Sequence, residues 1–424
     1  MAEESYGQGL EREVIAAYKE GHKFLYSKPY LEDALLAISG VQSKEDIANY
    51  KRRIDKIVFK MIDDIGINSK QPKEELAKKF YRYLQQTKRR NFKGKFRLTD
   101  AIIARENPSP DIGIGNCACL VAEWAVYGIK ASLAGHQNLL LEHNHVVGRM
   151  DNGQKFPILA DLTVDGAFIQ NERGREDYYK FRRYYAGEDM NPDEQTVEDF
   201  LKNRFQRAPL ERIIPCFINN RACEKMTRDK NQEGAMEDFT KIIDIDPNFS
   251  MALVNRGLIH FSNMRNKEAE RDFLDALALV PYNSNIHVNL GAIYLRKGLF
   301  CRDYNEFDES NFWFRKAEEL LDKSVDLDRL NPDAYYHRRL LRSEALGDKN
   351  GAQEDLKAYQ RCKRHDPCEH QKTDLPEFPM ERKRMKIDIP NICKLDKGRT
   401  IHGLREFYVV HLSKYLYPLR KIFG

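Results

Sequence analysis

The stretch Ile243–His260, IDIDPNFSMALVNRGLIH, decides how the C-terminal half of this chain folds. The same pattern returns 34 residues later in Leu277–Tyr294, LALVPYNSNIHVNLGAIY, with a proline, an asparagine and a glycine at matching places. A recurrence at this period, with small residues at matching places, is typical of stacked helix pairs. We therefore predict an all-α solenoid in this half of the chain.

The repeat extends in both directions from this stretch. The prolines that close successive helix pairs are Pro247, Pro281, Pro332 and Pro367. They step by 34, 51 and 35 residues, and the long step predicts a 17-residue insertion near residues 301–317. The pattern resembles the tetratricopeptide repeat (TPR), which implies about four repeats over 211–367. Such a solenoid has a concave face, and we expect it to bind a protein or peptide partner.

The N-terminal half has a different sequence pattern. Residues 1–95 show successive helical patterns, and we assign them to the helical N-terminal part of a first domain whose core spans 96–210. In that core an apolar helix begins at Cys117, and strand-like runs follow at Asn138–Leu141, His145–Arg149 and Lys155–Ala160. The sequence Asp151-Asn152-Gly153 is a strong hairpin signal. A helix followed by antiparallel strands predicts an α+β domain.

Cys117, His145 and Asp161 form the candidate catalytic site. Cys117 starts its helix, where unpaired backbone N–H groups favour a reactive thiolate. Counting outward from the Asn152-Gly153 turn, residue 145 meets residue 160, or 161 if the loop holds one residue more. His145 and Asp161 are therefore predicted to be cross-strand neighbours. A cysteine, a base beside it and a carboxylate that orients the base are the groups that nucleophilic catalysis requires.

Four segments carry a resemblance to a known family: FRLTDAIIAR from Phe96, IGNC ending at Cys117, His145-Val-Val147 and Leu159-Ala-Asp161. They resemble the transglutaminase-like core, a papain-like fold with Cys, His and Asp in this chain order. The resemblance implies acyl transfer by a protease, deamidase or cross-linker: Cys117 attacks an amide carbonyl, His145 shuttles the proton and Asp161 orients His145. Val147 departs from the family's usual aromatic, which leaves the substrate type open.

Several alternatives stay open at this site. His143 shares the strand face of His145 and is an alternative base, and Asp165 is an alternative to Asp161. Cys117, Cys119, His143 and His145 have suitable zinc ligands, but their spacing is unlike that of structural zinc sites, so we predict no metal or cofactor. Cys119 is expected to be a small buried hydrophobe. The alternative function is a non-catalytic scaffold that combines an inactive transglutaminase-like core with TPR repeats.

Composition limits the remaining choices. The net charge is only +5 with 70 basic and 65 acidic residues, and we predict no nucleic-acid partner. No window approaches the ~20 apolar residues of a membrane span. The N-terminus lacks a signal-peptide pattern and the eight cysteines are scattered, so we predict a cytoplasmic protein, with signal-independent export left open. The oligomeric state is not predicted. The tail, 368–424, is expected to end in a helix at Leu404–Leu416.

Overall fold

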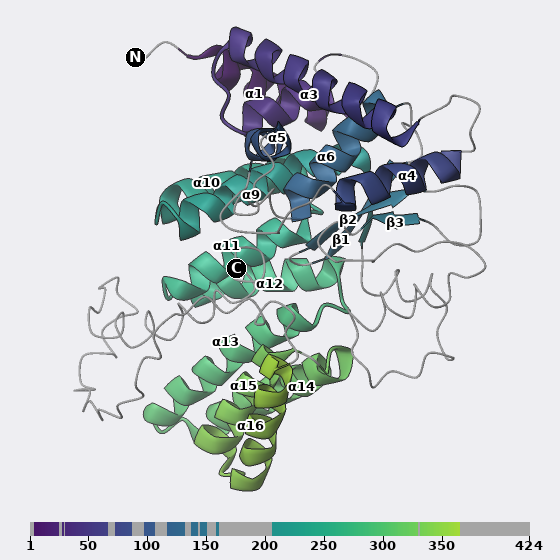
Figure 1. Cartoon of the computed structure of the whole chain (residues 1–424). Helices are drawn as coiled ribbons and strands as arrows, with labels where there is room; N and C mark the ends of the chain where they lie inside the picture. The colour runs from purple at the N-terminus through teal and green to yellow at the C-terminus, as the bar shows by residue number, and fades with distance from the viewer. Residues whose placement is uncertain are drawn as a thin grey trace.

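The computed structural model describes residues 4–24, 28, 30–66, 73–86, 97–106, 117–131, 137–142, 145–150, 158–160, 206–329 and 331–364. Within these ranges the chain forms a group of helices, a small sheet and then a stack of helix pairs (Figure 1). The predicted turn at Asp151–Gly153 and the predicted helix at Leu404–Leu416 lie outside the described residues.

Five helices precede the apolar helix, and local capping fixes where two of them begin. They are α1 (Tyr6–Lys19), α2 (Leu31–Ile38), α3 (Lys44–Ile65), α4 (Lys73–Gln86) and α5 (Leu98–Glu106). The Ser5 side chain accepts a hydrogen bond from the Gln8 N–H, and the Ser43 side chain accepts one from the Asp46 N–H. These bonds satisfy donors that a helix start leaves unpaired. Gly66 ends α3 in the left-handed conformation, which glycine adopts without strain.

Helix α6 (Cys117–Lys130) is the centre of the N-terminal core, because every residue from Cys117 to Gly128 is buried. Four antiparallel strands accompany it in the order β3-β2-β1-β4. They are β1 (Gln137–Glu142), β2 (His145–Met150), β3 (Ile158–Ala160) and β4 (Gln206–Pro209). The sequence predicted the positions of β1 and β2 to within one residue, whereas β4 was not predicted.

The predicted register of the hairpin is wrong. In the structure Gly148 pairs with Ala160 and Met150 pairs with Ile158, so seven residues separate the paired strand ends. A two-residue turn at Asn152-Gly153 would instead have placed Ala160 opposite His145. Loop length sets hairpin register, and the prediction took the local turn signal as the loop. Ala160 therefore lies three residues from the predicted pairing, about 10 Å along β2.

A buried ion pair joins α5 to α6. Arg105 Nε and Nη2 donate to the two carboxylate oxygens of Glu123, each at 3.0 Å, and the side chains are 5% and 0% exposed. The Tyr127 hydroxyl donates to Glu123 Oε1 at 3.2 Å, and Arg105 also reaches the Leu84 carbonyl of α4. Because each charge is hydrogen-bonded within the core, the pair fixes how three helices meet.

The C-terminal half is a stack of four helix pairs, as the 34-residue period predicts (Figure 1). The pairs are α9 (Ile213–Thr227) with α10 (Gln232–Ile245), α11 (Ser250–Ser262) with α12 (Asn266–Leu279), α13 (Ser284–Asp303) with α14 (Phe307–Leu327), and α15 (Pro332–Leu341) with α16 (Lys349–Arg364). A short helix, η1 (Leu210–Arg212), leads from β4 into α9, and a π-helical turn, η2 (Arg342–Leu346), follows α15. The repeats are thus TPR-like helix pairs.

Glycines set the close crossings within the pairs. A Cβ on Gly257 would lie 2.6 Å from the Phe273 ring, and one on Gly291 would lie 2.8 Å from Leu321. Both contacts are too short for any side chain. The third pair has a second crossing of this kind, because a Cβ on Gly298 would lie 2.5 Å from Phe314.

The third pair carries its extra residues in its helices. Helices α13 and α14 have 20 and 21 residues, against 13 and 14 for α11 and α12, so each is seven residues, or about two turns, longer. Gly298 and Phe314 lie seven residues from Gly291 and Leu321, so the extension repeats the crossing. The proline count gave 17 extra residues because Pro332 is the first residue of α15, whereas Pro247 and Pro281 precede their helices by three residues.

Arginine–aspartate pairs recur between the two helices of a pair. Arg221 binds Asp238, Arg256 binds Asp272 and Arg338 binds Asp355, all with N–O distances near 2.8 Å. The third pair has leucines at the two matching positions, Leu290 and Leu320. The helices of that pair are therefore held together without this charge contact.

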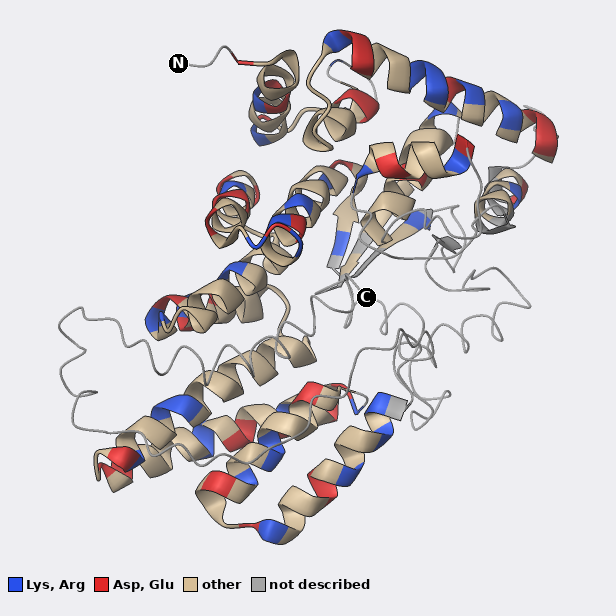
Figure 2. Ribbon diagram, turned by 60° about the vertical axis from the view of Figure 1, so that its left-hand side comes forward, with Lys and Arg blue, Asp and Glu red and all other residues tan. Residues whose placement is uncertain are grey.

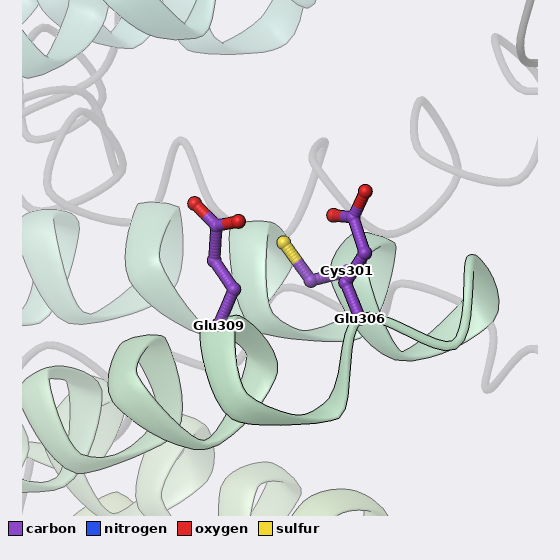
Figure 3. A group of neighbouring side chains, drawn as sticks. All are labelled: Cys301, Glu306 and Glu309. Atoms are coloured by element: carbon purple, nitrogen blue, oxygen red, sulfur yellow. The ribbon is translucent and has the colours of Figure 1, made fainter.

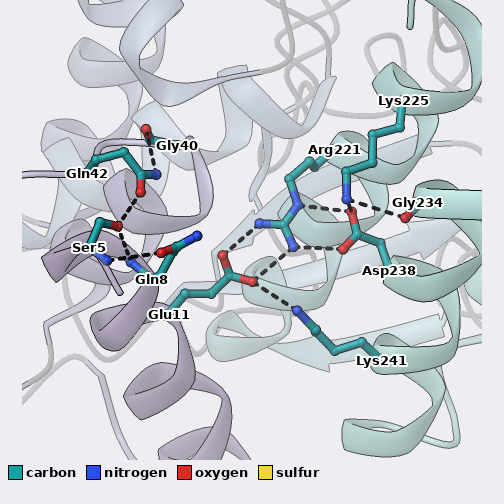
Figure 4. Close-up of polar contacts among 10 residues, drawn as sticks. All are labelled: Ser5, Gln8, Glu11, Gly40, Gln42, Arg221, Lys225, Gly234, Asp238 and Lys241. Atoms are coloured by element: carbon teal, nitrogen blue, oxygen red, sulfur yellow. Dashed lines mark hydrogen bonds and ion pairs between the residues drawn. The ribbon is translucent and has the colours of Figure 1, made fainter. Parts of the chain in front are cut away.

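Helix α1 covers the start of the stack and contacts Arg221, the arginine of the first Arg–Asp pair (Figure 4). Glu11 of α1 accepts from Arg221 Nη1 and Nη2 at 2.7 and 2.9 Å. In the fourth pair Arg338 makes the matching contact with Asp322 of the preceding helix, α14, at 2.8 Å. Helix α1 therefore takes the place that the second helix of a preceding repeat would occupy. One apolar cluster runs from Leu10 to Ile259, so the first helix pair shares the N-terminal core.

Candidate functional site

Cys117 is the first residue of α6 and is 7% exposed. Two thiols of α9, Cys216 and Cys223, lie near it. Burial raises the pKa of both, and the nearby Cys117 adds to the rise. Buried thiols of this kind stay protonated and act as small hydrophobic groups. The Cys117 end of α6 therefore packs against the first helix of the solenoid.

Two contacts fix how the sheet lies on α6. A Cβ on Gly148 would lie 2.8 Å from the Trp124 ring. A Cβ on Gly128, four residues further along α6, would lie 2.4 Å from the side-chain amide of Gln137, which pairs with Met150 of β2. From Gly148 back to His145 is three strand residues, about 10 Å. From Trp124 back to Cys117 is seven helix residues, also about 10 Å. The start of β2 at His145 therefore lies toward the Cys117 end of α6.

The remaining predicted site residues are not brought together by the described structure. The backbone of His145 begins β2, while Asp161, His143 and Asp165 lie outside the described residues. The observed register moves Ala160 away from His145. The residue count that predicted a cross-strand contact between His145 and Asp161 is therefore wrong.

The zinc alternative has no geometric support in the described residues. Cys119 is fully buried, as predicted. Residues two apart on a helix point to nearly opposite sides. Cys117 and Cys119 therefore cannot both turn their sulfurs toward one ion while α6 is intact.

Within the described part of the chain, one other group has ligand atoms close enough for an ion (Figure 3). Cys301 lies in the last turn of α13, Glu306 is the N-cap residue of α14 and Glu309 lies in its first turn. The ligand atoms all lie within 4.8 Å of one another. Burial raises the pKa of Cys301, and the two carboxylates raise it further, so the thiol stays protonated. Both glutamates are exposed. Nothing in the group itself points to a bound metal.

The inner face of the solenoid is the side of the first helices that points away from their partners. On α11, Gly257 faces α12, and the opposite side carries Met251, Asn255 and Leu258 at helical spacing. The side chains at this face of α13 are Val288, Asn289, Ala292 and Leu295. The face is apolar with one asparagine on each helix. A protein segment with an apolar stripe has the complementary chemistry.

The two asparagines of this face differ in their partners. Asn255 Nδ2 donates to Asn219 Oδ1 of α9 at 3.0 Å. Its counterpart 34 residues on, Asn289, has a buried Nδ2 with no hydrogen-bond acceptor among the described residues. A buried unsatisfied donor costs about 1–3 kcal/mol. In the sequence Asn289 marks the repeat, and its unpaired donor was not predicted, although the recurrence of asparagine at positions 255 and 289 was visible.

In the part of the chain that the structure describes, neither a charged patch (Figure 2) nor a membrane-spanning helix adds another candidate site. Figure 2 shows basic and acidic residues interspersed along the helices. None of the described helices combines the length and apolarity that crossing a membrane requires.

Comparisons with known proteins point to the repeats. No family model matches the chain. The chain is 30% identical over 104 residues to the Photosystem I assembly protein Ycf3 of Prochlorococcus marinus strain SARG, covering 24% of this chain and 58% of that protein. It is 29% identical over 156 residues to Ycf3 of strain NATL1A, covering 34% of this chain and 88% of that protein. This chain thus spans about three-fifths of the first of these relatives.

Two solved structures of low sequence identity also match parts of the chain. A crystal structure of MamA is 16% identical, covers 45% of this chain and 87% of its own, and has a TM-score of 0.28. A crystal structure of menin is 12% identical, covers 83% of this chain and 82% of its own, and has a TM-score of 0.49.

Proposed function

We propose that this protein is a scaffold whose TPR-like repeats hold a protein or peptide partner on their inner face. The observation that carries the proposal is the inner face itself: apolar side chains surround Asn289, whose amide nitrogen has no acceptor among the described residues. A partner segment would bring apolar side chains to Val288 and Leu258 and a hydrogen-bond acceptor to Asn289. An extended or helical peptide can supply both.

The curated relatives support this role. They are named as assembly proteins of photosystem I, and assembly is a task for which a helical repeat surface is suited. The chain covers only part of the first of them. We therefore propose only the scaffold role by analogy with these relatives, and we do not propose their partner for this chain.

A site-specific crosslink tests the scaffold role. A photoreactive amino acid replaces Asn289 in the full chain, and in a matched variant it replaces Leu274, which is 45% exposed on α12. We expect protein adducts at position 289 that competing unlabelled chain reduces, and none at 274. Equal adduct formation at both positions, or none at 289, would contradict the proposal.

A second candidate is cysteine acyl transfer by Cys117, His145 and Asp161 in a transglutaminase-like core. It is favoured by one inference from the sheet contacts, that β2, which begins at His145, starts toward the end of α6 where Cys117 is the first residue. The reported relatives do not support it. In this mechanism the Cys117 thiolate attacks an amide carbonyl to form a thioester, and His145 passes the proton to the leaving amine.

Covalent labelling tests the second candidate. An electrophilic glutamine mimic should label Cys117 in the full chain near neutral pH, and His145→Ala should slow the labelling. Cys117→Ala should remove it, while Cys119→Ala, two residues along the helix, should not. Absence of labelling on Cys117 in the folded chain, with full labelling after denaturation, would leave the scaffold role alone.

The compartment is part of the same proposal. None of the six described cysteines forms a disulfide, and all six are buried. Unpaired thiols in this number favour a reducing compartment such as the cytoplasm.

A further inference from the structure

The inner face of α13 has two features that call for a ligand of defined chemistry. The Asn289 amide nitrogen is buried without an acceptor among the described residues, whereas the matching Asn255 is satisfied by Asn219. Val288 and Ala292, beside it, are only 3% and 7% exposed, yet neither belongs to the two apolar clusters of the described residues. A ligand for this face must bring apolar side chains together with a hydrogen-bond acceptor.

We propose that the chain's own C-terminal segment, Leu404–Leu416, docks on the inner face of α11 and α13 and competes there with protein partners. The segment has apolar side chains at helical spacing, at Leu404, Tyr408, Leu412 and Tyr415. Such a stripe matches the row formed by Leu258, Val288 and Leu295. The segment also brings a hydroxyl oxygen, on Tyr408 of the same stripe, that can accept from Asn289 Nδ2.

The tether between solenoid and segment has a suitable length. Helix α16 ends at Arg364, and 39 residues separate it from Leu404. A flexible chain of this length has a root-mean-square span of about 35 Å. The inner face of α13 lies one helix pair from the last pair, and packed helices are about 8–10 Å apart. The segment therefore reaches the face without strain.

Tethering also explains why the chain's own segment is favoured over a free partner. A ligand linked in this way acts at an effective concentration of about 1 mM, far above that of most free proteins. A partner must then outcompete the segment, so the tail sets a threshold for partner binding. This inference rests on the proposed scaffold role, because both use the same face.

The experiment measures binding of a fluorescent synthetic peptide of residues 400–424 to the full chain by anisotropy. In the wild-type chain the resident segment blocks the site. In the Leu412→Asp chain the resident segment is expelled, because a carboxylate in the middle of its apolar stripe would be buried. We expect the peptide to bind this variant at least tenfold more tightly than wild type, as a ~1 mM effective concentration gives against a Kd of about 100 μM.

Two matched controls accompany the measurement. Lys414→Asp introduces the same residue outside the apolar stripe and should behave as wild type. In the Leu412→Asp chain, adding Asn289→Ala should weaken peptide binding, whereas adding Leu274→Asp on α12 should not. Hydrogen exchange of the inner-face amides of α11 and α13 should rise in the Leu412→Asp chain without any change in α3.

The outcomes separate this inference from the scaffold role. Equal peptide affinity of the wild-type and Leu412→Asp chains, or no binding to either, would overturn self-docking. If Asn289 still crosslinks a protein partner in that case, the scaffold role stands and the partner is the occupant. If residues 161–205 rather than 404–416 are protected from exchange in the wild-type chain, a different segment covers the face and self-docking is again overturned.

Discussion

The N-terminal core and the solenoid treat buried charge in different ways. In the core, Arg105 and Glu123 form one sealed pair between α5 and α6. In the solenoid, Arg256 and Asp272 form a pair whose arginine is partly exposed, and the same contact recurs in other helix pairs. The third helix pair has leucines instead.

The difference follows from how each contact is shared. The sealed pair is hydrogen-bonded to Tyr127 and Leu84, so α4, α5 and α6 depend on it together. A repeated contact joins neighbouring helices of the stack, and the second and third pairs also have their own crossing glycines. Charge in the core is therefore expected to be indispensable, whereas charge in a repeat can be replaced by apolar contact.

The largest expected effect is from breaking the sealed pair. Arg105→Met leaves the Glu123 carboxylate in the core without its counter-charge. We expect a loss of about 3–5 kcal/mol of unfolding free energy, measured by urea denaturation at neutral pH. Arg105→Met combined with Glu123→Leu should recover most of the loss, since two apolar groups then fill the site. A loss below about 1 kcal/mol in the single variant would mean that the core opens to water at this point.

Helix α15 contains a buried titratable side chain, a histidine, that stays neutral near pH 7. Burial lowers the pKa of His337 to about 4. The unfolded value is about 6.5, so the unfolded state takes up the proton first as the pH falls. The stability is complete above pH 6.5 and falls as the pH drops toward 4, by about 3 kcal/mol in all.

His337→Gln tests this pH dependence because glutamine does not titrate. Urea midpoints between pH 7 and 4.5 should fall in both chains, because burial also lowers the pKa of His260 and His287, but less steeply in the variant. The carboxylates of Glu11 and Asp238 do not interfere in this window. Burial raises their pKa values, but Arg221 outweighs it and lowers them, so their contribution is lost only near and below pH 4. Parallel slopes in the two chains would contradict the assignment.

Next in size is the second crossing of the third pair. Gly298→Ala places a methyl group against the Phe314 ring, and we expect a loss of about 1–3 kcal/mol, measured by urea denaturation. Gly9→Ala on α1 is the matched control, because nothing lies within 4 Å of a Cβ there. That substitution should stabilise the chain by about 0.5–1 kcal/mol through helix propensity. If both substitutions stabilise, the two helices of the third pair separate more easily than the contact implies.

The sequence predicted features that repeat and missed those that occur once. The 34-residue recurrence around Gly257 predicted the helix pairs because each repeat must present the same small residue to its partner. The hairpin register failed because the local Asn152-Gly153 signal says nothing of how many residues the loop holds. The contact of Glu11 with Arg221 joins residues 210 apart and has no local signal. Glu123, a charge inside an apolar helix, was a visible sign of a buried pair.

The smallest expected effect comes from giving the second helix pair the leucines of the third. Arg256→Leu alone leaves the Asp272 carboxylate buried. His260 Nε2 lies 3.8 Å from it, but burial lowers the pKa of His260, so His260 does not supply the missing positive charge near neutral pH. We expect a loss of about 1–3 kcal/mol for this variant. Arg256→Leu with Asp272→Leu should return to within about 1 kcal/mol of the wild-type chain, because apolar groups replace both charges. A double-mutant cycle from urea midpoints, with hydrogen exchange of α11 and α12 to localise the change, measures both. If the double variant is no more stable than the single one, the leucines of the third pair suffice there only because its longer helices add the Gly298–Phe314 crossing. The Arg–Asp contact would then be what holds a short pair together.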